Sequence, residues 1–230
     1  MDLFELENQM APSVAGWLRG QGFSVKQEFS LPWGICDLVG VKFNQKKVQK
    51  RISNGQMRAV GSSFRLHILS KIPDSDVSGS SITLHELRRE LAGSLPYDLL
   101  ENEIAQLVRS KFVTSPARKR FQKLNGWAPL HSRIVAIELK LDRTLEALAQ
   151  ARLNRAFSTE SYVALPAQLA CRVASSKRSD DFRQCGIGLL AVSSGVCERV
   201  LPSRLCPDMR DDVLQAHCVE RFWRTRDTSS

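Results

Sequence analysis

Two opposite charges one residue apart, Glu138 and Lys140, stand near the end of the apolar, β-branched run Arg133-Ile-Val-Ala-Ile-Glu-Leu-Lys-Leu141. Successive side chains of a strand alternate between its two faces, so the two groups would point the same way, roughly 6.6 Å apart along the strand. A charge taken out of water is costly unless something pairs with it or uses it. The pair therefore indicates a site, and the alternative is a surface strand whose Glu and Lys only meet water.

Two further acids fall on elements that could bring them to this pair. Asp37 is the single acid of a strand predicted over residues 35–43, which forms a hairpin with a strand over 23–31. Glu7 lies on the apolar stripe of a helix predicted over residues 2–20. A carboxylate on such a stripe either meets a metal or a cation, or reaches out to water.

After residue 129 the chain alternates between strand-like and helix-like segments. The strands are expected over residues 161–165, 185–192 and 196–201, and the helices over 144–157, 167–177 and 208–223. Gln150 is on the first of these helices, where an ordinary surface amide is the alternative to a functional role. Strands alternating with helices after a hairpin predict an α/β fold with a mixed central sheet flanked by helices.

The formal net charge of +9 is concentrated in the middle of the 230-residue chain. Residues 42–128 hold 16 Lys and Arg against 7 Asp and Glu, whereas the remainder holds 17 of each kind. Residues 42–71 and 109–123 contain cations and no acids, and residues 72–108 are net negative. Two basic patches favour a polyanion as partner, and a solvated surface that only aids solubility is the alternative.

Residues 44–128 are expected to form an inserted, mainly helical module. Residues 64–72, the capping box Thr83-Leu-His-Glu86 and the stretch after Pro96 predict three helices, and residues 112–123 predict a basic hairpin. This order resembles the winged helix-turn-helix family in pattern.

The third of these helices departs from that pattern because it is acidic. Its exposed positions include Asp98, Glu101 and Glu103, which DNA phosphates would repel, so a protein-docking role for this helix stays open. Contacts to phosphates are expected instead from the cations on either side of it, which are Lys46, Lys47, Lys50, Arg51, Arg118, Lys119, Arg120 and Lys123.

The order of the chemical groups along the chain resembles the PD-(D/E)XK nuclease superfamily, which has a restriction-endonuclease-like core. The likeness covers a helix, a hairpin with Asp37, a strand ending in Glu138-Leu-Lys140, a helix with Gln150 and the strand Tyr-Val-Ala-Leu-Pro. It departs from the family at Cys36, where proline is frequent. The resemblance implies a discontinuous nuclease core of residues 1–43 and 129–230, with residues 44–128 inserted as the basic winged-helix-like module.

The same resemblance implies the roles of the site residues. Asp37, Glu138, the backbone carbonyl of Leu139 and, as an extra ligand, Glu7 would hold Mg²⁺, with Mn²⁺ as an alternative. Carboxylates suit this ion, which neutralises charge on a phosphodiester during hydrolysis. Lys140 would orient or deprotonate the attacking water, and Gln150 would position water or phosphate.

We therefore expect a metal-dependent deoxyribonuclease that cuts DNA, with double-stranded DNA favoured, in defence, restriction or repair. The alternatives are a non-catalytic DNA-binding regulator on a nuclease-like scaffold and a subunit of a larger complex that a protein partner controls. A homodimer is a further open alternative. Neither a signal peptide nor a membrane span is evident in the sequence, so a cytoplasmic protein is expected.

The six cysteines include no Cys-x-x-Cys pair, which argues against a zinc ribbon, and a disulfide scaffold is unusual in a chain of this size. A zinc site drawn from Cys197, Cys206, His217 and Cys218 is an alternative, although the spacing fits no standard pattern. Reduced thiols in apolar surroundings are the expectation.

Overall fold

The computed structural model describes residues 4–76, 80–91, 96–124, 127, 129–205 and 210–225. The chain divides into two compact units, each described by itself below. Unit 1 comprises residues 1–43 and 131–211, and unit 2 comprises residues 44–130 and 212–230. Within the described ranges, no helix combines the length and the apolar composition needed to cross a lipid bilayer.

Unit 1 is built on a six-stranded sheet with the strand order β1-β2-β6-β7-β8-β9. The strands are β1 Ser24–Leu31, β2 Gly34–Phe43, β6 His131–Leu139, β7 Glu160–Pro166, β8 Gly188–Ser193 and β9 Val196–Leu201. β6, β7 and β8 run parallel, whereas β1, β2 and β6 pair antiparallel, as do β8 and β9. The predicted α/β class with a mixed central sheet is confirmed.

The helices of unit 1 come from both ends of its sequence. They are η1 Glu7–Met10, α1 Ala11–Gly20, α6 Thr144–Leu153, η3 Asn154–Ala156, α7 Ala167–Ala174 and α8 Arg178–Cys185. The single helix predicted over residues 2–20 is instead a 3₁₀ turn followed by an α-helix, with Pro12 in the first turn of α1, where its missing N–H costs nothing. Residues 1–3 lie outside the described ranges.

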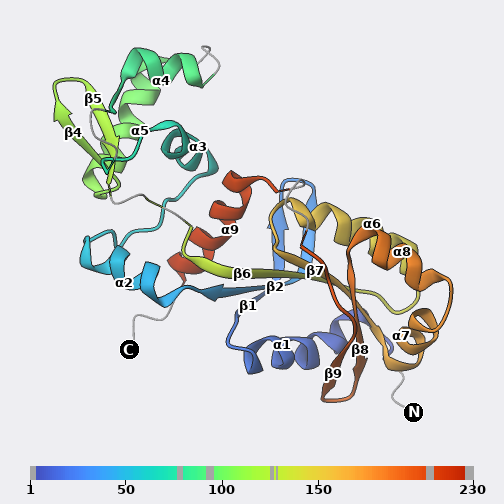
Figure 1. The fold of residues 1–230 in the computed structure, drawn as a ribbon. Helices are drawn as coiled ribbons and strands as arrows, with labels where there is room; N and C mark the ends of the chain where they lie inside the picture. The colour runs from blue at the N-terminus through green and yellow to red at the C-terminus, as the bar shows by residue number, and fades with distance from the viewer. Residues whose placement is uncertain are drawn as a thin grey trace. The chain divides into compact units, whose positions relative to one another are not determined.

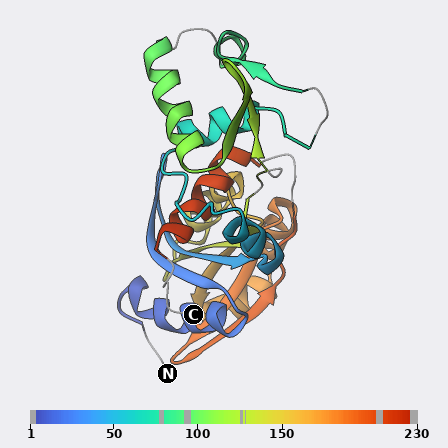
Figure 2. The same ribbon diagram turned by 90° about the vertical axis from the view of Figure 1, so that its left-hand side faces the viewer.

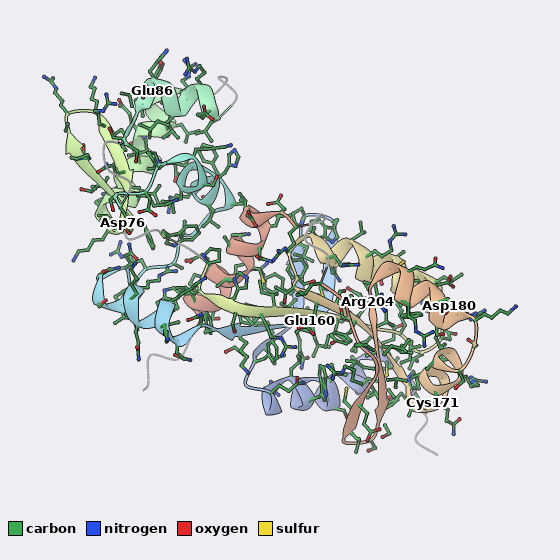
Figure 3. All side chains as sticks on the ribbon, in the orientation of Figure 1. Asp76, Glu86, Glu160, Cys171, Asp180 and Arg204 are labelled. Carbon is green, nitrogen blue, oxygen red and sulfur yellow. The ribbon has the colours of Figure 1, made fainter. Side chains whose placement is uncertain are left out.

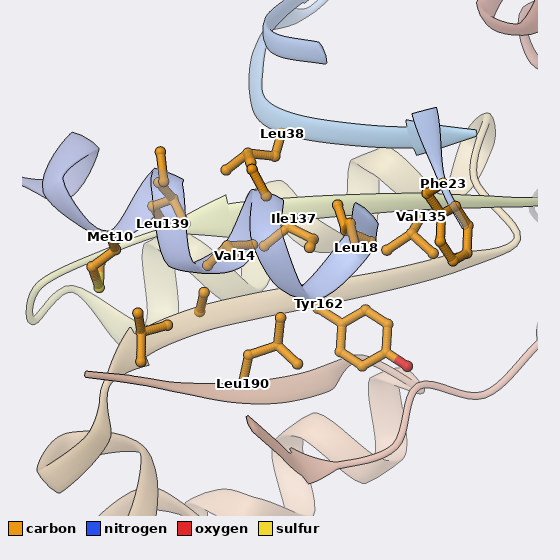
Figure 4. Packing of buried hydrophobic residues seen from close by; sticks show 14 residues of the cluster. Met10, Val14, Leu18, Phe23, Leu38, Val135, Ile137, Leu139, Tyr162 and Leu190 are labelled. Carbon is orange, nitrogen blue, oxygen red and sulfur yellow. The ribbon is translucent and has the colours of Figure 1, made fainter. Parts of the chain in front are cut away.

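Apolar side chains on the two faces of this sheet form separate clusters, as their alternation along the strands requires. On one face, Met10 of η1 and Val14 and Leu18 of α1 pack against a group that includes Ile137 and Tyr162 (Figure 4). On the other face, α6, α7 and α8 pack against alternate residues of β7 and β8 (Figure 1). The sheet is thus covered by helices on both sides.

A substitution at Gly188 would test the packing between β7 and β8. A Cβ at this position would lie 2.3 Å from two carbons of the Tyr162 ring and 2.8 Å from the backbone nitrogen of Ser203. Gly188→Ala is therefore expected to lower the free energy of unfolding by about 1–3 kcal/mol in urea denaturation, as overpacking does in other cores. Gly16→Ala on α1 is the control, because its Cβ would meet nothing within 4 Å. Equal stability of the two variants would contradict the described packing.

Unit 2 contains five helices and a small sheet within its described residues. Its helices are α2 Gln45–Ser53, α3 Ser63–Lys71, α4 Leu84–Glu90, α5 Tyr97–Arg109 and α9 Asp212–Arg224. Its strands β3 Ile82–Thr83, β4 Val113–Ala117 and β5 Arg120–Lys123 form a sheet in the order β3-β5-β4. Figure 2 shows α5 beside this sheet, and α3 packs against α9.

All four elements predicted for this segment, three helices and a hairpin, are present. The capping box opens α4, where Thr83 accepts a hydrogen bond from the Glu86 backbone and the Glu86 carboxylate accepts one from the Thr83 N–H at 2.8 Å (Figure 3). These hydrogen bonds hold the pKa of Glu86 below its ordinary value. The helices predicted over residues 64–72 and after Pro96 are α3 and α5, and the basic hairpin is β4–β5.

Two features of unit 2 differ from the sequence expectation. Helix α2 was not predicted, and the terminal helix α9 groups with residues 44–130 rather than with the core to which residues 129–230 were assigned. The reason is a buried ion pair between Arg51 of α2 and Glu220 of α9, in which both carboxylate oxygens accept from the guanidinium.

Arg51 and Glu220 sit at the centre of a network that is closed to solvent. The guanidinium also donates to the backbone carbonyls of Gln56 and Arg58, at 3.0 and 2.8 Å, and stacks over the ring of Trp223. The Val60 N–H donates to Glu220 at 2.7 Å. The expectation that Arg51 contacts phosphate is wrong. Its side chain is 2% exposed, and its guanidinium N–H groups already donate to Glu220 and to backbone carbonyls.

Candidate active site

Strand pairing between β2 and β6 brings Asp37 and Glu138 together, although 101 positions separate them in the sequence. The antiparallel register pairs Leu38 with Ile137, so Asp37 and Glu138 are the next residues along the two strands. The Asp37 carboxylate accepts a hydrogen bond from the Leu139 N–H at 2.7 Å. This bond fixes Asp37 at the end of β6, where the backbone ladder stops.

The carboxylate of Glu138 is the most perturbed group in this neighbourhood. Glu138 is 2% exposed, and the Asn154 side-chain amide donates to its Oε1 at 2.5 Å. Burial, followed by the negative charge of Asp37, raises the pKa of Glu138 from its ordinary 4.5 to about 7. The pKa of Asp37 is raised as well, mainly by burial, while the Leu139 N–H acts in the opposite direction. Two desolvated carboxylates side by side favour a cation between them.

Lys140 supplies a positive charge beside these acids. Its side chain is largely buried, and its ammonium group donates to the Glu7 carboxylate at 3.2 Å and to the Leu139 carbonyl at 3.1 Å. Its backbone N–H donates to Ala164 of β7 at 3.1 Å, which extends the parallel pairing of β6 by one residue. Glu7 on η1, predicted to face inward, thus reaches Lys140.

Gln150 has an unusual environment for a helix amide. Its Oε1 atom is buried and has no hydrogen-bond partner within the described part of the chain. Gln150 precedes Asn154 by four residues, so the two lie on the same side of the segment formed by α6 and η3. A buried oxygen without a donor is costly, so Gln150 is a candidate to accept a hydrogen bond from a further group.

The donor set fits the ion that the sequence predicts. Asp37, Glu138 and the carbonyl of Leu139 offer hard oxygen ligands, and Mg²⁺ characteristically takes one or two carboxylates and keeps several waters. Glu7 is engaged by Lys140, so it is a positioning acid in this arrangement. Among the described residues, no group of three or more His, Cys, Asp or Glu side chains forms a metal cluster, which leaves the two-carboxylate site as the one to test.

Comparisons with protein-family models, curated proteins and solved structures found no match. The similarity to PD-(D/E)XK nucleases therefore stays a prediction that rests on the order of the residues. The geometry of Asp37, Glu138 and Lys140 is an independent observation, because it depends on strand register and not on similarity to another protein.

The raised pKa of Glu138 has a measurable consequence for metal-free protein. Between about pH 4.5 and 7 the folded chain keeps a proton that the unfolded chain releases, so the free energy of unfolding should fall as pH rises through that window. Glu138→Gln should remove this slope and stabilise the protein at pH 8 by up to about 3 kcal/mol, because one pKa unit corresponds to about 1.4 kcal/mol.

This prediction is checked by urea unfolding in a chelator at several pH values. Glu198→Gln on β9 is the control, because Glu198 is exposed and should leave the slope in place. Adding Mg²⁺ at pH 8 should stabilise the wild-type protein and not Glu138→Gln, since only the ionised pair attracts the cation. A pH dependence between 4.5 and 7 that Glu138→Gln leaves unchanged would contradict the burial of an ionisable Glu138.

The predicted phosphate contacts of unit 2 differ in their exposure. Lys46, Lys47 and Lys50 are exposed on α2, although Lys47 also donates to the Pro129 carbonyl at 3.2 Å. Arg118, Lys119 and Arg120 are exposed around the β4–β5 turn, and Arg120 donates to the Ser81 hydroxyl at 2.7 Å. Lys123 is half-buried.

Two residues of the site carried no assigned role in the sequence analysis. Asn154 orients Glu138, and Cys36 donates to the Leu38 carbonyl at 3.3 Å while its sulfur lies 3.5 Å from the Asn154 amide nitrogen. Burial and the charge of Glu138 raise the pKa of the Cys36 thiol, which therefore stays neutral. The signal for Asn154 was its position one helical turn after Gln150.

The alternative zinc site is only partly covered by the structure. Cys206 lies outside the described residues. Burial and then the charge of Glu198 raise the pKa of Cys197 to about 12, so this sulfur is a thiol in the metal-free protein.

Proposed function

We propose that this protein is a divalent-metal-dependent DNA nuclease that hydrolyses phosphodiester bonds with a PD-(D/E)XK-like core. The observation that carries the proposal is the pairing of β2 with β6, which leaves Asp37 and Glu138 adjacent, desolvated and mutually repelling, one residue from Lys140. Structural ion-pair networks also shift pKa values, but here two acids, Glu138 buried and Asp37 half-buried, lie side by side near a cation. Such an arrangement is typical of sites that bind a cation for chemistry.

Each residue has a separate task in this proposal. Asp37, Glu138 and the Leu139 carbonyl would hold Mg²⁺, which when bound offsets charge that accumulates on the scissile phosphate. Asn154 keeps the Glu138 carboxylate in one orientation. Glu7 holds the Lys140 ammonium, whose three protons reach Glu7, the Leu139 carbonyl and one further acceptor.

The further acceptor of Lys140 is the attacking water or a phosphate oxygen. An ammonium group fixed at two of its three protons aims the third in one direction, which orients the nucleophile without further loss of side-chain freedom. Gln150 offers its unsatisfied Oε1 as an acceptor for the same water. In this proposal the carboxylates bind the metal, and the lysine and the amide position the nucleophile.

Unit 2 is proposed to hold the DNA as a winged-helix-like module. Its elements follow in the order α3, β3, α4, α5, β4, β5 with a three-stranded sheet, which is the order of a winged helix. The exposed cations of α2 and of the β4–β5 turn supply contacts to phosphates, with double-stranded DNA as the favoured ligand. Asp98 and Glu101 of α5 are exposed, so α5 itself is proposed to face away from the DNA or toward a protein.

The proposal is tested by incubating plasmid, linear and single-stranded DNA with the protein in Mg²⁺, Mn²⁺ or a chelator. Cleavage in either metal that the chelator and Asp37→Asn both abolish supports a nuclease. Tight, salt-sensitive binding without cleavage in any metal would overturn it in favour of a DNA-binding regulator. Loss of both activities until a protein partner or a second copy is added would favour a subunit of a larger assembly.

A further inference from the structure

A cavity of about 420 Å³ lies in unit 1 at the carboxyl ends of the parallel strands β6, β7 and β8. Leu141 and Asp142 line it just after β6, Pro166 at the end of β7, and Ser193 at the end of β8. The carboxyl ends of strands in open α/β sheets are where ligands of such folds bind. The mechanism proposed above does not use this cavity.

The cavity begins one residue beyond the site. Leu141 follows Lys140 directly, and consecutive Cα atoms are about 3.8 Å apart. Lys140 in turn contacts the carbonyl of Leu139, a proposed metal ligand. One wall of the cavity is therefore formed by the residue that follows the site along the chain.

The lining suits a nucleoside better than a simple ion or a lipid chain. Leu141, Leu169 and Val192 provide an apolar wall against which a base can pack, and the amide of Gln168 and the hydroxyl of Ser193 can pair with its polar edge. Arg172 is exposed at the cavity and Asp142 carries the opposite charge. The volume falls within the usual range of small-ligand sites, roughly 300–1,000 Å³, and is too small for a base pair with its backbones.

We propose that this cavity receives one unpaired nucleoside of the DNA, adjacent to the phosphodiester that is hydrolysed. The inference rests on the proposed nuclease function and narrows its substrate class. A base inside a duplex is stacked and paired, and it enters a pocket only after both interactions are broken. The preferred substrate is therefore duplex DNA with an unpaired nucleotide at the cut, such as an overhang or a flap.

Binding of deoxyadenosine monophosphate in a chelator tests the cavity without requiring cleavage. The experiment is an NMR titration of wild type, Gln168→Trp and Gln184→Trp, with inorganic phosphate as a second ligand. Gln168 lines the cavity, whereas Gln184 is an exposed glutamine on α8 that does not, so the two variants carry the same substitution. We expect wild type and Gln184→Trp to bind alike and Gln168→Trp to bind at least tenfold more weakly. Equal binding by all three proteins, or phosphate binding as tight as the nucleotide, overturns the inference.

A cleavage assay then distinguishes the nuclease proposal from the nucleoside-cavity proposal. In Mg²⁺ the wild-type protein should cut a duplex with a three-nucleotide overhang at least tenfold faster than the blunt duplex, and Gln168→Trp should lose that preference. If the wild-type protein cuts both duplexes at equal rates, the inference that the cavity binds a nucleoside is wrong, and the proposed nuclease function still stands. Nucleotide binding that depends on Gln168, without cleavage in any metal, would support the cavity and overturn the nuclease.

Discussion

Lys140→Ala is expected to lower Mg²⁺-dependent DNA cleavage by about 10²- to 10⁴-fold, the usual contribution of a positioned acid or base. The reason is geometric, since the Lys140 ammonium is held by Glu7 and by the Leu139 carbonyl and has one proton left to direct at a water or a phosphate oxygen. Alanine removes that donor and leaves Asp37 and Glu138 in place. Single-turnover rates at saturating Mg²⁺ measure the loss.

The control for this prediction is Lys177→Ala, which removes an exposed lysine at the start of α8 and the same unit of net charge. Its cleavage rate should equal that of the wild-type protein. Mg²⁺-induced stabilisation should survive in Lys140→Ala, because the carboxylates remain, and thermal unfolding in Mg²⁺ measures it. A Lys140→Ala variant that cuts DNA at the wild-type rate would show that the lysine only neutralises Glu7.

The strands of the core were predictable because their signal is local. The β-branched run 133–141 corresponds to β6, and the short apolar run 161–165 corresponds to β7, with shifts of one or two residues at their ends. Both strands are buried on two faces, so each reads as a continuous apolar stretch. The capping box at Thr83 was predictable for a similar reason, since its hydrogen bonds join residues three positions apart.

Helix α2 and its tie to α9 were not predictable in this way. The sequence Gln45–Ser53 is strongly polar and basic, and Val48 and Ile52 are the only aliphatic residues in it, so its two-residue apolar stripe is easily overlooked. The helix buries Arg51 instead of a leucine, and the partner of that charge is 169 positions away. A cation that looks like a phosphate contact in the sequence is thus a structural residue.

Some residues of the site were predictable from the sequence and others were not. Asp37, Glu138 and Lys140 could be named because their types and order suit metal-assisted hydrolysis, and the register of β2 and β6 then joins the two acids. Asn154 could be given no role from its place one helical turn after Gln150, because only the fold brings its amide to 2.5 Å from Glu138. Supporting contacts depend on tertiary packing, which no local pattern encodes.

Glu220→Ala is expected to destabilise unit 2 by about 3–5 kcal/mol, the usual cost of leaving one partner of a buried ion pair unpaired. Arg51 would keep its two backbone carbonyl partners and its ring contact with Trp223, yet its charge would remain in a site closed to water. The Val60 N–H would lose its acceptor as well. Hydrogen exchange at the amides of α2 and α9 measures the loss where it should be largest.

The control is the double variant Arg51→Met with Glu220→Leu, which removes both charges and keeps apolar volume between α2 and α9. It should be more stable than Glu220→Ala, because no uncompensated charge stays buried, although the unsatisfied Val60 N–H still costs about 1–3 kcal/mol. Equal stability of the single and double variants would mean that lost packing, rather than the stranded guanidinium, dominates. Wild-type exchange in Glu220→Ala would show that α9 does not depend on this pair.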